Sequence, residues 1–367
     1  MGINMKKIIL YGIANREIRV KIQSYISENC KIIGISDSIH TEDYLQGMKY
    51  IYPDDIVNYS FDYIIIQAEK ENTQKEIVEM LQRKGIKRDK IVVPRLLCVP
   101  GIDFIPDLKR DLLNEIETKK QADSICLGLS YSLRGIDFNK LCLECIDCSW
   151  HGLDLYYCYK NAECFQKKRF KIALLVFPYY YFNYDMSLSE YQFNTGQIMA
   201  CRGFEDWHNA NYSHNSTIRD YLVSMELFGK KFWKNRIWKR EIPKNENVIE
   251  YVQEELSQVW KRNYKKTIEE NEDIFELLVK KIRHMRIVLI IPPIFWGGVK
   301  EKEKLYIIQQ KELFYNAINE YYKNNIVEIY DFSEKMQLRE YFYDYEHLNE
   351  IGRQEFTRLL NQVLVGE

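Results

Sequence analysis

Short, uninterrupted apolar runs rich in isoleucine and valine recur along this chain, and they constrain its fold more than any other feature. Examples are Lys6–Tyr11 (KKIILY), Lys171–Phe177 (KIALLVF) and Arg286–Ile291 (RIVLII), with stretches of helical spacing in between. Strands with continuous, non-alternating apolar sequence are buried on both faces, which is typical of parallel sheets built from βαβ units. The sequence therefore predicts an α/β protein.

The runs fall into two series, and the first lies in residues 1–100. Strands are predicted at Lys6–Tyr11, Lys31–Ile35, Phe61–Gln67 and Lys90–Val93, and helices over Arg16–Glu28 and Gln74–Lys84. This order of strand and helix predicts a Rossmann-like domain with a parallel sheet. Residues 101–121 are polar with helical spacing, and we interpret them as a connector.

The second series predicts another α/β domain over residues 122–367, and 367 residues are enough for two cores. Its strands are expected at Ser124–Leu127, Lys171–Phe177, Arg286–Ile291 and Ile326–Tyr330, and its helices at Val248–His284, Lys302–Asn324 and Glu350–Val363. The stretch from Tyr179 to Arg240 is aromatic and aperiodic, so we expect irregular structure there.

Composition and charge exclude several classes of protein. Lys and Arg number 52 against 53 Asp and Glu, for a formal charge of -1, so a general nucleic-acid binder is not expected. The local basic run Lys230–Arg240 is interpreted as a solvated face. The sequence contains no apolar stretch of about 18 residues, so no membrane-spanning helix is predicted. The N-terminus carries no signal-peptide cleavage pattern.

The nine cysteines are odd in number and scattered, which fits a reducing, cytoplasmic location. Their densest group has two-residue gaps but no second Cys/His pair at finger-like distance, so buried free thiols are favoured over a metal site. The group comprises Cys126, Cys142, Cys145, Cys148 and Cys158. No metal and no cofactor is predicted.

Two distant motifs carry the chemistry of the second domain. The first predicted strand ends in Gly128-Leu-Ser130, which would place the serine at the start of the next helix with its hydroxyl exposed. Ser132 is an alternative two residues further on. Near the C-terminus, Asp344-Tyr-Glu-His347-Leu-Asn-Glu-Ile-Gly352 sets a carboxylate three residues before a histidine, a spacing that can orient the imidazole ring as a base for serine.

These motifs resemble those of the SGNH (GDSL-like) hydrolase and acyltransferase superfamily, over roughly residues 122–367. The resemblance implies a flavodoxin-like α/β/α sandwich in which Ser130 is the nucleophile and His347, oriented by Asp344, is the base. It also implies oxyanion donors after the second and third strands, for which Gly152 and Asn183 are the candidates, with Asn194 and Asn209 as substitutes for Asn183. Leu129 stands where the family usually has aspartate, and the family's G-x-N-D block is not present as such.

The resemblance is strongest to bacterial members that act on cell-surface carbohydrates. It implies a serine-dependent O-acyl esterase or O-acyltransferase in polysaccharide biosynthesis, acting on a surface glycan or on its nucleotide-sugar or lipid-linked precursor. With no export signal, a cytoplasmic precursor is the favoured substrate. The alternative is a non-catalytic nucleotide-sugar or glycan-binding protein that keeps the hydrolase fold.

The first domain resembles the N-terminal Rossmann-type domains of bacterial sugar-modifying enzymes. Gly12 follows its first strand and Asp37 its second, where a glycine turn and a ribose-binding carboxylate are expected in a nucleotide site. Only one glycine of the dinucleotide fingerprint is present, so NAD binding is not expected. A nucleotide-sugar ligand and a purely structural role remain alternatives.

Two further features bear on the site. His208 and His214 are six residues apart in the irregular stretch, which is not a favoured metal spacing, so substrate or surface contact is preferred. Pro292–Gly298 follows a strand and either walls the site or only ends the strand.

Overall fold

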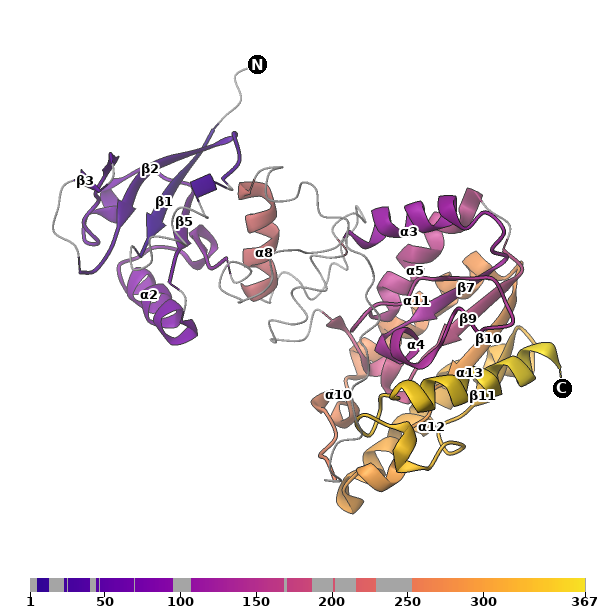
Figure 1. Cartoon of the computed structure of the whole chain (residues 1–367). Helices are drawn as coiled ribbons and strands as arrows, with labels where there is room; N and C mark the ends of the chain where they lie inside the picture. The colour runs from indigo at the N-terminus through magenta and orange to yellow at the C-terminus, as the bar shows by residue number, and fades with distance from the viewer. Residues whose placement is uncertain are drawn as a thin grey trace. The chain divides into compact units, whose positions relative to one another are not determined.

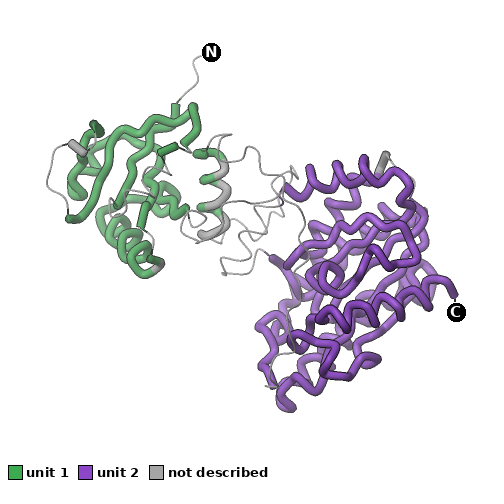
Figure 2. Tube along the Cα trace, in the orientation of Figure 1, with its two compact units in different colours: residues 1–106, 190–200, 208–238 green, residues 107–189, 201–207, 239–367 purple. Residues whose placement is uncertain are grey.

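The computed structural model (Figure 1) describes residues 5–12, 23–24, 26–39, 44–45, 47–68, 70–94, 107–167, 170–186, 201, 216–228 and 253–366. The chain forms two compact units (Figure 2). Unit 1 contains residues 1–106, 190–200 and 208–238, and unit 2 contains residues 107–189, 201–207 and 239–367.

Unit 1 is built on a four-stranded sheet in the order β2-β1-β5-β6, with all neighbours parallel. The strands are β1 (Lys6–Tyr11), β2 (Cys30–Ser36), β5 (Tyr63–Ile66) and β6 (Ile91–Val92). A small antiparallel pair, β3 (Tyr44–Leu45) and β4 (Met48–Lys49), lies between β2 and β5 in sequence and was not predicted. Helix α2 (Glu71–Arg83) and the 3-10 turns η1 (Ile56–Asn58) and η2 (Arg88–Lys90) connect the later strands.

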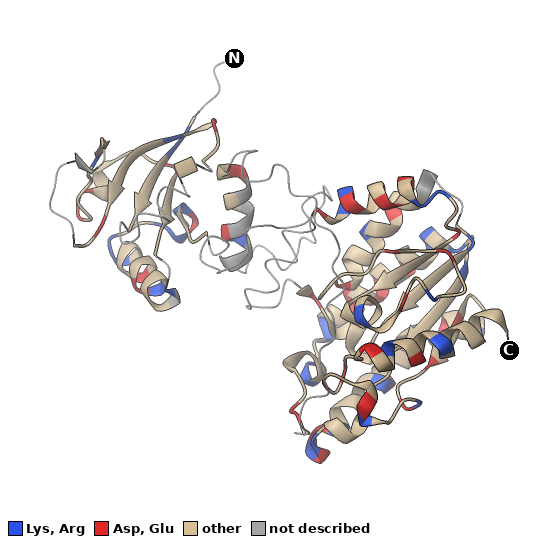
Figure 3. Ribbon diagram, in the orientation of Figure 1, with Lys and Arg blue, Asp and Glu red and all other residues tan. Residues whose placement is uncertain are grey.

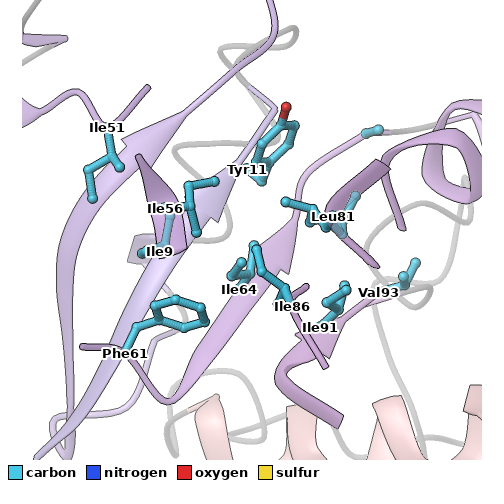
Figure 4. Packing of buried hydrophobic residues seen from close by; sticks show 12 residues of the cluster. Ile9, Tyr11, Ile51, Ile56, Phe61, Ile64, Leu81, Ile86, Ile91 and Val93 are labelled. Atoms are coloured by element: carbon cyan, nitrogen blue, oxygen red, sulfur yellow. The ribbon is translucent and has the colours of Figure 1, made fainter. Parts of the chain in front are cut away.

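The apolar runs of unit 1 supply both faces of its sheet, as continuous hydrophobic strands should. On one face, Ile9, Ile64 and Ile91 pack with Leu81 of α2 in a single buried cluster (Figure 4). On the other face, Ile8, Leu10, Ile65 and Val92 form a second cluster. Alternate residues of each strand thus point to opposite sides, which explains why no polar residue interrupts these runs.

Helix α8 (Ser216–Leu227) belongs to unit 1, although it follows the third strand of unit 2 in sequence. Leu227 and Phe228 join the second apolar cluster of the sheet. The Asp220 carboxylate accepts hydrogen bonds from Arg88 at 2.8 and 3.0 Å. The expectation that residues 179–240 are irregular throughout is therefore wrong at α8, whose stability depends on contacts with distant residues. The two units also divide the chain differently from the predicted, uninterrupted 122–367 domain.

Unit 2 contains a five-stranded parallel sheet in the order β11-β10-β9-β7-β8. The strands are β7 (Ser124–Gly128), β8 (Cys145–Asp147), β9 (Ile172–Val176), β10 (Arg286–Ile291) and β11 (Val327–Asp331). Counted in chain order within the unit this is 2-1-3-4-5, the flavodoxin-like arrangement. The predicted α/β class with two parallel sheets is confirmed.

Helices cover both faces of this sheet. Right-handed crossovers place the helix between β7 and β8 on one face and those that follow β8, β9 and β10 on the other. Accordingly α13 packs against α4, and α11 packs against α5. The helices are α3 (Leu108–Thr118), α4 (Ser130–Gly135), α5 (Leu155–Glu163), α10 (Gln258–Lys261), α11 (Lys265–Ile282), α12 (Lys304–Lys323) and α13 (Glu350–Val365), with 3-10 turns η4 (Cys164–Lys167), η5 (Tyr179–Asn183), η7 (Trp296–Gly298), η8 (Glu301–Glu303) and η9 (Arg339–Tyr341).

The prediction of helix over Val248–His284 is correct only in part, because residues 253–257 are not helical and α10 and α11 are separate helices. The side chains of Asn183 and Gln310 form hydrogen bonds with the backbone between α10 and α11. The Asn183 Oδ1 atom accepts from the Tyr264 N–H at 3.0 Å, and Gln310 Nε2 donates to the carbonyls of Trp260 at 3.0 Å and Arg262 at 2.7 Å. These side chains replace the hydrogen bonds that a continuous helix would have formed.

Charge and apolar surface follow the sequence expectations. Acidic and basic side chains are interspersed along the helices (Figure 3). Within the described ranges, every helix is too short or too polar to cross a membrane. Four of the grouped cysteines are buried, namely Cys126, Cys145, Cys148 and Cys158, whereas Cys142 is exposed. The predicted helix over Arg16–Glu28 and the basic run 230–240 lie largely or wholly outside the described residues.

Candidate active site

The site begins where β7 ends, at the point where the sheet reverses its strand order. Strand β7 lies between β8 and β9, and ligands of open α/β sheets bind at the carboxyl ends of strands beside such a switch. Gly128 is the last residue of β7, and a Cβ there would lie 2.7 Å from the Val176 carbonyl oxygen of β9. Only glycine fits this close strand approach, and two residues later Ser130 opens α4.

The second part of the site is the loop before α13. The Asp344 Oδ1 atom accepts hydrogen bonds from the backbone N–H groups of Glu346 at 2.8 Å and His347 at 2.6 Å, which closes a tight turn. Asn349 then caps α13 by accepting from the Gly352 N–H at 3.0 Å. The D-x-x-H-L-N-x-x-G string is thus a turn, a histidine and a helix cap in succession.

The fold brings the three predicted catalytic residues together. Ser130 Oγ lies 2.8 Å from His347 Nε2, and His347 Nδ1 lies 2.8 Å from Asp344 Oδ2. An ionised aspartate has no proton to donate and acts only as a hydrogen-bond acceptor. Asp344 therefore favours the tautomer of His347 that carries its proton on Nδ1. Nε2 is then free to accept the serine proton, the arrangement that serine nucleophiles require.

The electrostatics of the pair strengthen this arrangement. Burial of His347 would lower its pKa, but the hydrogen bond to Asp344 and the negative charges of Asp344 and Glu346 raise the pKa above the ordinary 6.5. Burial of Asp344 would raise its pKa, but the hydrogen bond and charge of His347 hold the pKa below 3.8. Asp344 is therefore ionised at neutral pH and stabilises the imidazolium form of His347.

Aromatic and acidic side chains surround the histidine. The Tyr131 ring stacks on His347 with centroids 5.4 Å apart and planes 18° apart. The Tyr131 hydroxyl donates to Glu346 Oε2 at 2.5 Å, and Trp260 Nε1 donates to the same oxygen at 3.1 Å. Tyr180 of η5 packs edge-on against Trp260. Tyr131, which follows Ser130, and Glu346, which precedes His347, are thus joined by a direct hydrogen bond.

Ser132, the alternative nucleophile, occupies a different environment. Its side chain is buried, and its hydroxyl donates to the Leu129 carbonyl at 2.9 Å. It supports the turn beneath Ser130, and the serine in contact with His347 is Ser130.

The two candidate oxyanion residues lie in loops near the same edge of the sheet. Gly152 follows β8 with a φ of 63°, in the left-handed region, and its carbonyl accepts from the Tyr184 hydroxyl at 2.7 Å. The Asn183 amide group contacts the 262–264 backbone, donating to the Arg262 carbonyl and accepting from Tyr264 N–H. These contacts give Asn183 a structural function, and the oxyanion roles of both residues stay predictions.

The two candidate ligand-binding residues of the first domain, Gly12 and Asp37, lie at the strand ends where the sequence predicted them. Gly12 directly follows β1 with a φ of 92°, and its N–H donates to the Ser36 carbonyl at 2.9 Å. Asp37 directly follows β2, and its Oδ1 accepts from the Ile39 N–H at 3.0 Å. Their role in ligand binding stays a prediction.

Some predicted features lie outside the described residues, namely Asn194, Asn209, His208 and His214. The Pro292–Gly298 stretch is described, and it contacts the loop before α13: Phe295 N–H donates to the Tyr345 carbonyl at 2.8 Å. This contact joins the end of β10 to the turn that carries His347.

Sequence reasoning missed Glu346 and Trp260. Glu346 lies inside the quoted motif, so it carried a local signal. Trp260 carried none, because it reaches Glu346 only through the folding of residues 253–264 against η5.

Comparison with known proteins adds little to this picture. The family model described as "C2185-like, N-terminal" matches residues 4–92. A solved structure, provisionally described as a platelet activating factor from Streptococcus pneumonia, aligns with 70% of this chain and 92% of its own length, at 11% identity and a TM-score of 0.36. No curated protein shows significant similarity to the chain. The family-model match lies within unit 1.

Proposed function

We propose that unit 2 is a serine-dependent O-acyl esterase or O-acyltransferase of the SGNH type. The observation that carries this proposal is the continuous chain Ser130 Oγ–His347 Nε2, 2.8 Å, and His347 Nδ1–Asp344 Oδ2, 2.8 Å, at the switch point of the sheet. A serine, a histidine and an ionised aspartate in this order form a nucleophile, its base and the group that orients the base.

The reaction follows from these roles. His347 Nε2 takes the Ser130 proton as Oγ bonds to the ester carbonyl carbon, and the carbonyl electrons move onto oxygen. The backbone N–H of Ser130, at the start of α4, and that of Gly152 are the candidate donors to this oxyanion. Collapse expels the alcohol, which receives the proton from His347. Water or a sugar hydroxyl then gives its proton to His347, attacks the acyl group and releases Ser130.

The proposed substrate is an acyl ester of a bacterial surface glycan, or of its nucleotide-sugar or lipid-linked precursor. This part rests on the resemblance of residues 122–367 to enzymes of surface carbohydrates and on the Rossmann-like unit that precedes them. Water as acceptor makes the enzyme an esterase, and a sugar hydroxyl makes it a transferase.

Covalent labelling of the full chain with a fluorophosphonate tests the chemistry. We expect labelling and 4-nitrophenyl acetate hydrolysis by the wild type, and loss of both in Ser130→Ala. Ser132→Ala tests the alternative nucleophile and should keep the label, since the Ser132 hydroxyl contacts the Leu129 carbonyl and Ser130 is the serine in contact with His347. Ser60→Ala, in an exposed residue of unit 1, is the matched control. Equal labelling of wild type and Ser130→Ala would overturn the assignment of the nucleophile.

A second candidate function, binding of a nucleotide-sugar or glycan, is favoured by one observation in unit 1. Ser36 Oγ and both amide atoms of Gln67 are buried and have no hydrogen-bond partner in the described structure. They lie at the carboxyl ends of β2 and β5, beside Gly12. Buried polar atoms without partners cost free energy, and a polar ligand at this edge would satisfy them.

Thermal stabilisation of Ser130→Ala by a panel of nucleoside diphosphate sugars tests this candidate without interference from hydrolysis. We expect a ligand that stabilises the protein to lose its effect in Gln67→Met, which keeps the side-chain size and removes both polar atoms. Stabilisation together with absent fluorophosphonate labelling would favour the binding protein over the enzyme. No stabilisation by any sugar nucleotide would remove this candidate.

A further inference from the structure

Arg134 lies on the same face of α4 as Ser130. The two residues are four positions apart in a helix that spans Ser130–Gly135, and such pairs have Cβ atoms about 5–6 Å apart. The long arginine side chain can therefore reach the space in front of the serine hydroxyl.

The guanidinium group of Arg134 has no carboxylate partner within the described part of the chain. Its Nε atom is buried and makes no hydrogen bond there. Two carboxylates near the histidine are engaged by other groups: Asp344 by His347, and Glu346 by Tyr131 and Trp260. A third, Glu254, is exposed and lies within electrostatic reach of His347. An arginine is always charged, and leaving it partly buried without an anion is unfavourable.

The charge of Arg134 acts on the reacting groups. It opposes the acidic neighbours of His347 and lowers the pKa of that ring, so the cation lies within electrostatic reach of the histidine. Its side chain is partly exposed, which leaves it accessible to a bound molecule. A planar guanidinium with free donors binds carboxylate and phosphate oxygens in pairs.

We propose that Arg134 is a specificity residue that binds an anionic group, a carboxylate or a phosphate, close to the ester bond that Ser130 attacks. This inference rests on the proposed function and adds the substrate class: acyl esters of acidic or phosphorylated sugars. A neutral ester fills the same site without neutralising the cation, so it is the poorer substrate.

Matched esters test the inference with the full chain. The probes are 4-acetoxybenzoate, 4-acetoxyphenyl phosphate and mono(4-nitrophenyl) adipate, each compared with its neutral methyl ester. The first two carry the anion on the alcohol side, as carboxylate and as phosphate, and the third carries it on the acyl side. We expect the wild type to prefer at least one anionic ester by about 10- to 100-fold in kcat/KM, as a charge-assisted hydrogen bond implies.

In Arg134→Gln the ratio of kcat/KM for each anionic ester to that for its neutral partner should fall to about one. Because both esters meet the same His347, the ratio is insensitive to any change in the His347 pKa that the lost charge causes. Arg134→Lys should retain part of the preference, since it keeps the charge but not the paired donors. Arg283→Gln, the same exchange in an exposed residue at the amino-terminal edge of the sheet, is the control. An equal loss for anionic and neutral esters would mean that Arg134 acts through His347 or the fold, and would overturn the inference.

A binding measurement separates this inference from the esterase proposal. Thermal stabilisation of Ser130→Ala by 4-acetoxybenzoate or 4-acetoxyphenyl phosphate, absent in Ser130→Ala/Arg134→Gln, would support the anion site even if the wild type hydrolyses no ester. An active esterase with no preference for any anionic ester, and no such stabilisation, would sink the Arg134 assignment and leave the serine chemistry in place.

Discussion

Glu346 Oε2 accepts a hydrogen bond from the Tyr131 hydroxyl at 2.5 Å, and so joins the residue that follows Ser130 to the residue that precedes His347. Tyr131 also stacks on the His347 ring. Together the two contacts hold Ser130 and His347 in a fixed position relative to each other. Trp260 donates to the same carboxylate oxygen at 3.1 Å. A carboxylate held next to the base is an electrostatic element as well as a structural one.

Replacing Glu346 with glutamine should shift the pH dependence of catalysis. The Glu346 charge is one cause of the raised His347 pKa, so its removal lowers that pKa. Since His347 must be neutral to accept the serine proton, the acid limb of the kcat/KM profile for 4-nitrophenyl acetate should move to lower pH in Glu346→Gln.

Exposed Glu340, six residues earlier in the chain, provides the matched control. Glu340→Gln makes the same change of charge without a contact to Tyr131 or Trp260, and its profile should overlie that of the wild type. An unmoved acid limb in Glu346→Gln would show that the carboxylate is only structural.

His347 should contribute to stability mainly at acidic pH. Its folded-state pKa is raised above 6.5, so the stabilisation by its charge is complete below the unfolded value and is lost as the pH rises through the folded value. The drop in melting temperature caused by His347→Gln should therefore be larger at about pH 5.5 than at pH 9. His284→Gln, the same exchange in an exposed residue, is the control.

Gly352→Ala should destabilise unit 2, although alanine is the better helix former. A Cβ at this position would lie 2.0 Å from the Tyr341 carbonyl oxygen, a clash with backbone that cannot move cheaply. We expect a loss of about 3 kcal/mol in the free energy of unfolding, measured by denaturant titration. The neighbouring Ile351→Ala, at a side chain 58% exposed, should change stability by less than about 0.5 kcal/mol. A stabilised Gly352→Ala would contradict the geometry.

Asp220→Ala should weaken unit 1 and leave unit 2 unchanged. The carboxylate is 2% exposed and pairs with Arg88 at 2.8 Å, and it also accepts from the Val93 N–H at 3.2 Å. Removing it leaves a partly buried cation unpaired, which costs about 3 kcal/mol. Hydrogen exchange should show faster exchange of β1 and β5 amides and unaltered β9 and β10 amides.

The control for that prediction is Glu226→Ala on the same helix. Glu226 pairs with Lys6 at the surface, with the glutamate side chain 61% exposed. An exposed pair contributes less than about 1 kcal/mol, so exchange in unit 1 should barely change. Similar effects of the two substitutions would argue against a special role for Asp220.

Most strands of the two parallel sheets were predictable because each is a local signal, but the short strand β8 (Cys145–Asp147) was not predicted. Lys6–Tyr11 and Arg286–Ile291 were predicted with the bounds that they have in the structure, since a continuous apolar run fits only a strand buried on both faces. The order β2-β1-β5-β6 and the placement of α8 in unit 1 carry no such signal. They depend on pairing between segments that are distant in sequence.

The amino-acid sequence by itself determined the α/β class, the places of most strands and the two motifs, Gly128-Leu-Ser130 and Asp344-x-x-His347, because turns, caps and apolar runs are decided by neighbours a few residues apart. Only the tertiary structure decided that Ser130 and His347, 217 positions apart, lie 2.8 Å from each other. The same holds for Trp260 beside Glu346, and for Asn183 and Gln310 interrupting the helix at 262–264. These contacts depend on how the helices pack on the sheet, where each partner is supplied by another element, and no local pattern specifies that geometry.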